Sequence, residues 1–184
     1  MWKCQVPQEE HILPKIDLLA LRRDAREQAT RNKYYRQYIK EALPLSNDAL
    51  DAEVSALADG AFERIDCLDC GNCCRRKEIA VTAKDVRRSA RALGISTDQF
   101  VRRYVAETRD GDAYIKGAPC PFLGSDNACS IYADRPQACR EFPYLHERKV
   151  RARTLTMLEN VGECPIVADV WGRLMKQYPE PPKG

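Results

Sequence analysis

The sequence contains no long apolar run. None of its hydrophobic stretches reaches the roughly 20 residues that a transmembrane helix requires. The first twenty residues also lack the uninterrupted apolar stretch of a signal peptide, because acidic residues and the prolines Pro7 and Pro14 interrupt them. We therefore expect a cytoplasmic protein that neither crosses a membrane nor is secreted.

The chain also has little net charge. Although 31% of its residues are charged, the formal net charge is only +3, which argues against a general polyelectrolyte partner. There is no glycine-rich turn after a strand that would hold a nucleotide-like cofactor. No general base or nucleophile stands out apart from the cysteines, so no catalytic constellation is complete, which argues against an enzyme without excluding one.

Cysteine, in contrast, is abundant. The chain has 9 cysteines, and all except Cys4 lie between residues 67 and 164. In a reducing cytosol they are hard to keep as disulfides and easy to keep as metal ligands. A role as small buried apolar side chains would not require the dense spacing of CLDCGNCC at residues 67–74. Cys4 is remote from this cluster and is expected to be a free thiol.

The spacing of the first cysteines suits a metal. Cys67 and Cys70 form a C-x-x-C pair, which lets one tight turn supply two thiolates, and Gly71 can adopt the positive backbone angle of such a turn. Cys73 extends the run to C-x-x-C-x-x-C. Together with two remote Cys-Pro pairs, this run resembles the bacterial ferredoxin pattern for a four-iron cluster, although the fourth cysteine is far from its usual place. The spacing favours iron, as an iron–sulfur cluster, with zinc as the close alternative.

Cys74 follows Cys73 directly. Adjacent side chains diverge on a helical or extended backbone, so these two thiols suit different sites, or opposite sides of a polynuclear one, better than a single tetrahedral ion. The eight clustered cysteines also divide evenly into two sets of four. Two four-ligand centres and one binuclear centre with bridging thiolates are both compatible with this arithmetic.

The combined motifs resemble a known family. CLDCGNCC at 67–74, CPFL at 120–123, CSIYADRPQACREFPY at 129–144 and the final Cys164-Pro165 are similar to the bacterial CxxCxxCC proteins, which are described as zinc- or iron-chelating. The similarity covers roughly residues 67–165. It implies that the metal ligands are Cys67, Cys70, Cys73, Cys74, Cys120, Cys129, Cys139 and Cys164.

Two alternative functions stay open beside metal chelation. A similar cysteine region occurs in flagellin lysine methylases, which would make the chain a protein-modifying enzyme. Its C-x-x-C-x-x-C spacing nevertheless differs from the C-x-x-x-C-x-x-C of radical enzymes that use S-adenosylmethionine. The other alternative is a metal-stabilised adaptor that binds an acidic protein or nucleic acid. Its basic face would be the helical stripe formed by Lys84, Arg87, Arg88 and Arg91, although most such stripes are solvated faces.

Three further polar residues lie close to the later cysteines in sequence. Arg135 and Arg140 flank Cys139, where they could donate hydrogen bonds to a thiolate-rich centre or could simply fold the loop. His146 could ligate zinc in place of a cysteine.

The expected fold is mainly α, as a small α+β protein. A helical N-terminal arm over residues 1–66 precedes an irregular, loop-rich metal domain over residues 67–178, with short helices and little strand, and a tail over 179–184. In the arm, we expect one helix over about 13–43, which begins near Pro14, and a second helix capped by Ser46 or Asn47 that runs to about 65. In the metal domain, the patterns predict a strand over 78–81, a helix opened by a capping box at 82–85, a helix over 98–107, mostly loop over 108–143, and a last helix from Pro165.

Overall fold

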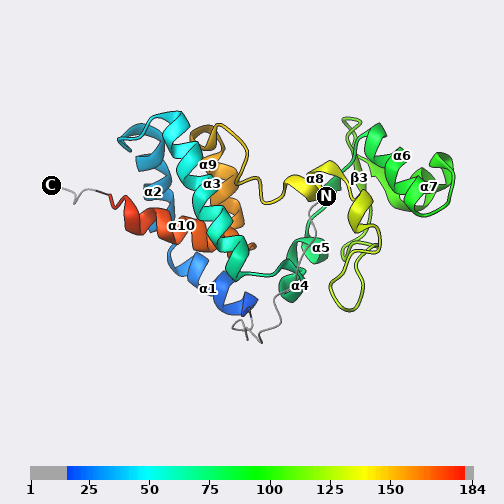
Figure 1. Cartoon of the computed structure of the whole chain (residues 1–184), viewed down its shortest axis with the longest axis horizontal. Coiled ribbons are helices and arrows are strands. Elements are labelled where there is room, and N and C mark those ends of the chain that lie inside the picture. Colours follow the sequence, from blue (N-terminus) through cyan, green and yellow to red (C-terminus); the bar gives the residue numbers. More distant parts are fainter. Residues whose placement is uncertain (1–15, 181–184) are drawn as a thin grey trace.

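The chain folds into two lobes joined by a narrow junction (Figure 1). The structure is a computed structural model that describes residues 16–180. These residues form ten α-helices and one three-stranded sheet, so the prediction of a mainly α fold with little strand is confirmed. None of these helices is long and apolar enough to span a membrane.

The first lobe, here called the helical lobe, combines helices from both halves of the chain. It contains α1 (Leu18–Glu27), α2 (Ala29–Glu41), α3 (Asn47–Arg64), α9 (Val150–Asn160) and α10 (Pro165–Gln177). The second, the sheet lobe, contains β1 (Ile79–Ala80), α6 (Ala83–Ala92), α7 (Thr97–Tyr104), β2 (Val105–Glu107), β3 (Ala113–Ile115), a 3-10 helix (Tyr132–Asp134) and α8 (Gln137–Glu141). The junction between them consists of two short helices, α4 (Cys67–Cys70) and α5 (Asn72–Arg76).

The helical lobe has a large apolar core. Tyr35 of α2 meets Trp171 of α10 edge to face, with ring centroids 5.5 Å apart, and both rings are almost fully buried. The Trp171 indole N–H donates to the side-chain oxygen of buried Asn32 at 3.1 Å, so its polar atom is satisfied inside the core. Helix α2 packs mainly on α9, and α3 packs on α10 and α9. Helices α2 and α3 therefore form a bundle with the C-terminal helices α9 and α10.

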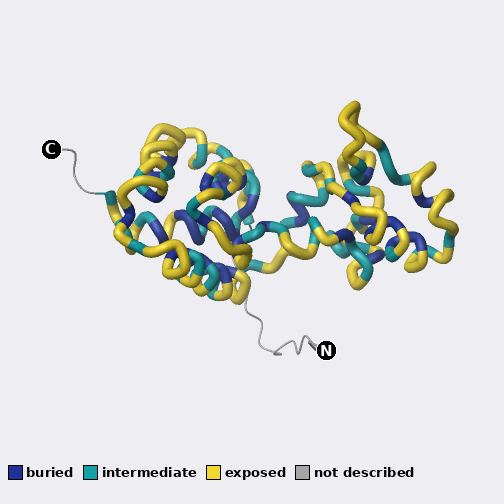
Figure 2. Tube along the Cα trace, turned by 90° about the horizontal axis from the view of Figure 1, so that it is seen from above, coloured by how far each residue is buried: buried dark blue, intermediate teal, exposed yellow. Residues whose placement is uncertain are grey.

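The sheet lobe has a smaller core. Its strands are antiparallel in the order β1-β3-β2, and Ile115 of β3 lies opposite both Ile79 and Val105. Phe100 of α7 and Phe122 of the following loop stack with centroids 6.0 Å apart. Figure 2 shows buried residues inside each lobe and only a thin connection between the lobes. Two hydrophobic clusters thus form on either side of the junction.

Local signals located several helices correctly. Ser46 caps α3 by accepting from the Ala49 amide, and Thr82 and Asp85 form both bonds of the predicted capping box on α6. Helix α10 begins at Pro165 as predicted. The predicted domain boundary at residue 66 stays a prediction. Helix α10, which follows this boundary, nevertheless packs on α3, which precedes it.

Two of the predicted helices have the wrong extent. The long N-terminal helix breaks at Gln28 into α1 and α2, which pack against different partners; its predicted start near Pro14 lies outside the described residues. The helix expected over 98–107 ends at Tyr104, because Val105 turns extended and pairs with β3. In both places a tertiary contact overrides the local propensity.

Candidate metal centre

The C-x-x-C turn at the junction has the expected glycine geometry. Asp66 caps α4 by accepting from the Leu68 amide at 2.8 Å, and Gly71 ends α4 with a left-handed φ of 55°. A β-carbon at Gly71 would also meet the side chains of Arg75 and Asn127. Only glycine suits both this backbone angle and this close approach, as the sequence predicted.

Two adjacent thiols occupy the next turn. The sulfur atoms of Cys73 and Cys74, both on α5, lie 3.9 Å apart and share a hydrogen bond. This bond lowers the pKa of the Cys73 thiol to about 7 and raises the pKa of Cys74. Cys73 is therefore the thiol of this pair that ionises first.

The sheet lobe brings further cysteines to this turn. The Cys120 amide donates to the carbonyl of Cys74 at 2.7 Å. Leu123 and Cys129 form an isolated antiparallel bridge, which folds the loop back so that Cys129 returns near Cys120. Cys120 and Cys129 both pack against the apolar core of the sheet lobe. Cys139 follows on α8, which packs against β1.

Cys164 approaches the junction from the other lobe. It is the N-cap residue of α10, is 8% exposed, and belongs to the core of the helical lobe. The preceding residue, Glu163, accepts from the side chain of buried Asn72 both at its carbonyl, at 2.7 Å, and at its carboxylate, at 3.1 Å. Arg22 of α1 in turn donates to Asn72 at 2.7 Å. These bonds hold the start of α10 beside α5.

Burial and mutual repulsion act on most of these thiols. Burial raises the pKa of Cys139 and of Cys164 to about 12, and the charges of neighbouring thiolates add to each rise. The charge on Cys73 opposes ionisation of thiols from both lobes, namely Cys67, Cys70, Cys74, Cys120, Cys139 and Cys164. The thiolate of Cys73 therefore lies close enough to these six thiols for its charge to act on them.

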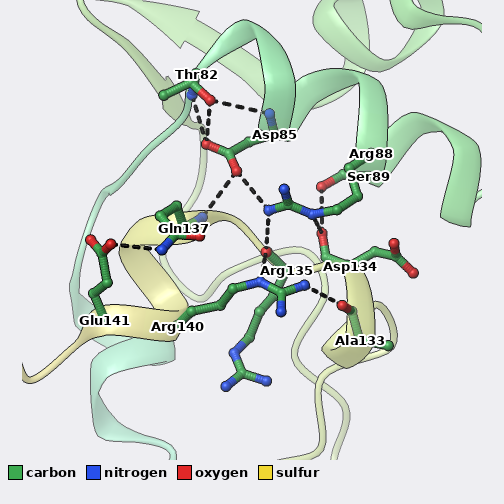
Figure 3. A network of polar contacts seen from close by, with 10 residues as sticks. All are labelled: Thr82, Asp85, Arg88, Ser89, Ala133, Asp134, Arg135, Gln137, Arg140 and Glu141. Carbon is green, nitrogen blue, oxygen red and sulfur yellow. Dashed lines mark hydrogen bonds and ion pairs between the residues drawn. The ribbon is translucent and has the colours of Figure 1, made fainter. Parts of the chain in front are cut away.

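A polar network fixes the loop that carries Cys139 (Figure 3). Buried Asp85 of α6 accepts from the Gln137 amide at 3.0 Å and from the Arg88 guanidinium at 2.6 Å. Arg88 also donates to the Arg135 carbonyl at 2.7 Å, and Ser89 donates to the Asp134 carbonyl at 3.1 Å. Helix α6 therefore holds both the loop before α8 and the first residue of α8, two residues before Cys139.

Arg88 is not part of an exposed basic stripe. Its guanidinium turns toward Asp85 and the carbonyls of the loop, whereas Lys84, Arg87 and Arg91 are exposed. The prediction that Arg88 belongs to the basic stripe is wrong, because Arg88 pairs with the buried carboxylate of Asp85, one helical turn earlier.

Arg135 and Arg140 mainly fold the loop. Arg135 donates to the Tyr132 carbonyl at 3.1 Å and lies over the Tyr132 ring, 3.8 Å from its centroid, while Arg140 donates to the Arg135 carbonyl at 3.1 Å. The positive charge of Arg135 nevertheless opposes the pKa rise of Cys67 and Cys139. Arg135 therefore folds the loop, and its charge also acts on the neighbouring thiols.

His146 lies away from the thiols, against α3. Its Nδ1 is 2.9 Å from the Ser55 hydroxyl, and its ring stacks on Phe62. The zinc-ligand alternative for this histidine stays a prediction.

Sequence reasoning did not identify Asn72 or the long-range role of Asp85. Asn72 sits inside the cysteine motif, where a buried polar residue among ligands could have been a signal. Asp85 was recognised only as a helix cap. Its second carboxylate oxygen bonds a residue 52 positions later, a contact that no local pattern reveals.

The arrangement supplies soft sulfur donors but no finished coordination shell. Across residues 16–180, no three Cys, His, Asp or Glu side chains already converge on one point as metal ligands. All-sulfur donor sets suit zinc and iron–sulfur clusters. Metal binding here would therefore draw together thiols that the fold has placed in one region.

Comparison with known proteins gives one match. The CxxCxxCC family, described as a "putative zinc- or iron-chelating domain", matches residues 66–161, a little over half of the chain. No curated protein and no solved structure matches.

Proposed function

The chain belongs to the CxxCxxCC family, and on this premise we propose that it binds iron or zinc through the thiolates at the junction. Zinc or iron chelation is the role that the family description supports. The proposed ligands are Cys67, Cys70, Cys73, Cys74, Cys120, Cys129, Cys139 and Cys164.

One observation carries the proposal. Hydrogen bonds hold Cys120 beside Cys74 and hold Glu163, which precedes Cys164, beside α5, and the charges of neighbouring thiolates oppose the ionisation of Cys120 and Cys164. A bound cation would reverse this repulsion, because thiolates are the form of cysteine that binds metal. Packing alone would not explain why Cys67, Cys70, Cys73 and Cys74 gather on the two short helices of the junction, outside both apolar cores.

Within this proposal, iron in an iron–sulfur cluster is favoured over zinc. The C-x-x-C-x-x-C spacing and the two Cys-Pro pairs support a cluster. The eight proposed ligands are all cysteines and form a purely sulfur donor set, which both metals accept. A cytoplasmic location fits this chemistry, because a reducing compartment keeps the thiols available.

Anaerobic purification followed by metal analysis and visible absorption tests the proposal. A brown protein with stoichiometric iron and acid-labile sulfide is the expected result. Stoichiometric zinc without colour would support chelation and refute the cluster. Protein that binds neither metal, both as purified and after anaerobic addition of Zn²⁺ or of Fe²⁺ with sulfide, would refute the proposed function itself.

A second role, as an adaptor, is supported by the exposed basic side chains Lys84, Arg87 and Arg91 on α6. They face solvent while Val86 and Ala90 of the same helix are buried, so the helix keeps its fold if their charges change. Reversal of these three charges should weaken binding to an acidic protein or nucleic acid. Unchanged binding would refute the role.

A further inference from the structure

The geometry points to two metal centres of four thiolates each. An interlobe centre would consist of Cys67, Cys70, Cys73 and Cys164, and a sheet-lobe centre of Cys74, Cys120, Cys129 and Cys139. The inference rests on the proposed function, because it divides the same ligands. It adds which of them share a metal and what each centre holds together.

The interlobe set is defined by contacts between the junction and α10. The Asn72 side chain bonds the Glu163 carbonyl, which fixes Cys164 relative to the neighbouring Cys73. Arg76 of α5 also pairs with the Glu163 carboxylate, at 3.2 Å. On the other side, Asp66 and Asp69 of the α4 region line the same cavity as Pro165, so the C-x-x-C turn also lies beside the start of α10.

The sheet-lobe set is defined by contacts of Cys74 with the loop of the sheet lobe. The bond from the Cys120 amide to the Cys74 carbonyl brings these two residues together. The bridge between Leu123 and Cys129 closes the loop, and a bond from the Ser130 amide to the Phe122 carbonyl at 2.8 Å supports it. Cys139 lies on α8, which packs against β1 and is held to α6 by the bond from the Gln137 amide to Asp85.

The adjacent pair on α5 separates the two sets. Consecutive side chains on a helix point about 100° apart, so Cys73 can face α10 while Cys74 faces the loop. Their sulfurs are still 3.9 Å apart, so the two centres would be neighbours. This explains why the sequence places two cysteines side by side.

The two centres would stabilise different parts of the fold. Cys164 belongs to the core of the helical lobe, so a metal in the interlobe centre would tie that lobe to the junction. Cys120, Cys129 and Cys139 all lie in the loop-rich part of the sheet lobe, so a metal in the second centre would hold those loops together. One centre therefore fixes the lobes relative to each other, and the other stabilises one lobe from within.

The test compares single cysteine variants of the full chain, purified anaerobically, by bound iron and zinc per chain. Cys67→Ser and Cys164→Ser should both keep only the metal of the sheet-lobe centre. Cys129→Ser and Cys139→Ser should both keep only the metal of the interlobe centre. The residual contents of the two groups should add up to the wild-type content. The double variant C67S/C139S should bind no metal, and Cys4→Ser should bind as much as the wild type.

The outcomes separate this inference from the proposed function. Loss of all metal from any one of the four single variants would overturn the division and indicate one shared polynuclear centre. A wild-type chain without metal would instead refute the proposed function. Because Cys164 is buried, the exposed Cys67 provides a variant of the same set that does not disturb a core, and unchanged helical circular dichroism in C67S verifies its fold.

Discussion

The two lobes reach stability by different means. The helical lobe buries a large apolar cluster that includes Tyr35, Leu50, Trp171 and Leu174, whereas the buried cluster of the sheet lobe contains only seven residues. The sheet lobe also carries the long irregular segment between β3 and α8, to which Cys120 and Cys129 belong, and Cys139 lies on α8 directly after it. A small core with long loops requires additional cross-links, and the thiols are placed where a metal would supply them. The helical lobe does not need that contribution.

Metal removal should therefore produce the largest difference in stability between the two lobes. Treatment with a strong chelator under reducing conditions should abolish slow hydrogen exchange in residues 113–141 and leave α2 and α3 protected, because these two helices belong to the large apolar cluster of the helical lobe. Hydrogen exchange with mass spectrometry measures both regions in one sample. Simultaneous loss of protection in α2 and α3 would show that the lobes are not independent in this sense.

A substitution in the core of the helical lobe should instead destabilise that lobe and leave the sheet lobe unchanged. Trp171→Ala removes a buried indole and its bond to Asn32, and should lower the free energy of unfolding of the helical lobe by about 3–5 kcal/mol. Chemical denaturation measures this loss. Metal bound by the sheet-lobe cysteines should be retained. Leu155→Ala, at a side chain 49% exposed, is the control and should change the stability by about 0.5 kcal/mol or less.

The Asp85 network should matter only to the sheet lobe. Asp85→Asn keeps the shape of the side chain but removes the charge that Arg88 pairs with, and should cost about 2 kcal/mol, less than a fully buried pair because Arg88 is 30% exposed. The substitution should also weaken metal binding at the centre that contains Cys139, because the Gln137 amide loses its charged acceptor. Equal stability of D85N and wild type in denaturant would contradict this role.

The same carboxylate predicts a pH dependence. Burial of Asp85 opposes its ionisation, but hydrogen bonds from Thr82, Gln137 and Arg88 outweigh burial and hold its pKa below the usual value. A lowered pKa stabilises the fold at neutral pH, and that contribution is lost as the pH falls through the lowered pKa, below about pH 4. Wild type should lose more stability than D85N between pH 5 and pH 3 in denaturation experiments.

Two helix caps give the smallest expected effects. Thr82→Ala in the sheet lobe and Asp51→Ala in the helical lobe should each cost about 1 kcal/mol. Thr82 caps its own helix, whereas Asp51 of α3 accepts from the Lys149 and Val150 amides, both at 2.8 Å, and so caps α9 from a distance. Hydrogen exchange should locate each loss in its own lobe, and a loss spread over both lobes would contradict their independence.

These caps also show which parts of the fold could be predicted. Where the capping residue is local, as at Ser46 and Thr82, the sequence located the helix. Helix α9 has no local cap, begins after Lys149 in a left-handed conformation, and was missed, because Asp51 lies 98 positions earlier in the chain. The break at Gln28 and the strand at Val105 depend on tertiary packing in the same way.

The candidate site follows the same division. The C-x-x-C turn and the positive backbone angle of Gly71 follow from short-range geometry. The side chains of Cys73 and Cys74, which were expected to diverge, instead place their sulfurs 3.9 Å apart. The placement of Cys164 depends on Asn72 and Glu163, which are 91 residues apart. The position of Cys139 depends on Asp85, and spacing alone could not reveal either contact.

Alkylation of cysteines, read by peptide mass spectrometry, tests most directly that the junction thiols hold metal. In the anaerobic metal-loaded protein, only Cys4 should react rapidly, and all nine cysteines should react after chelation in denaturant. Rapid labelling of any of the eight proposed ligands in the metal-loaded protein would contradict the account.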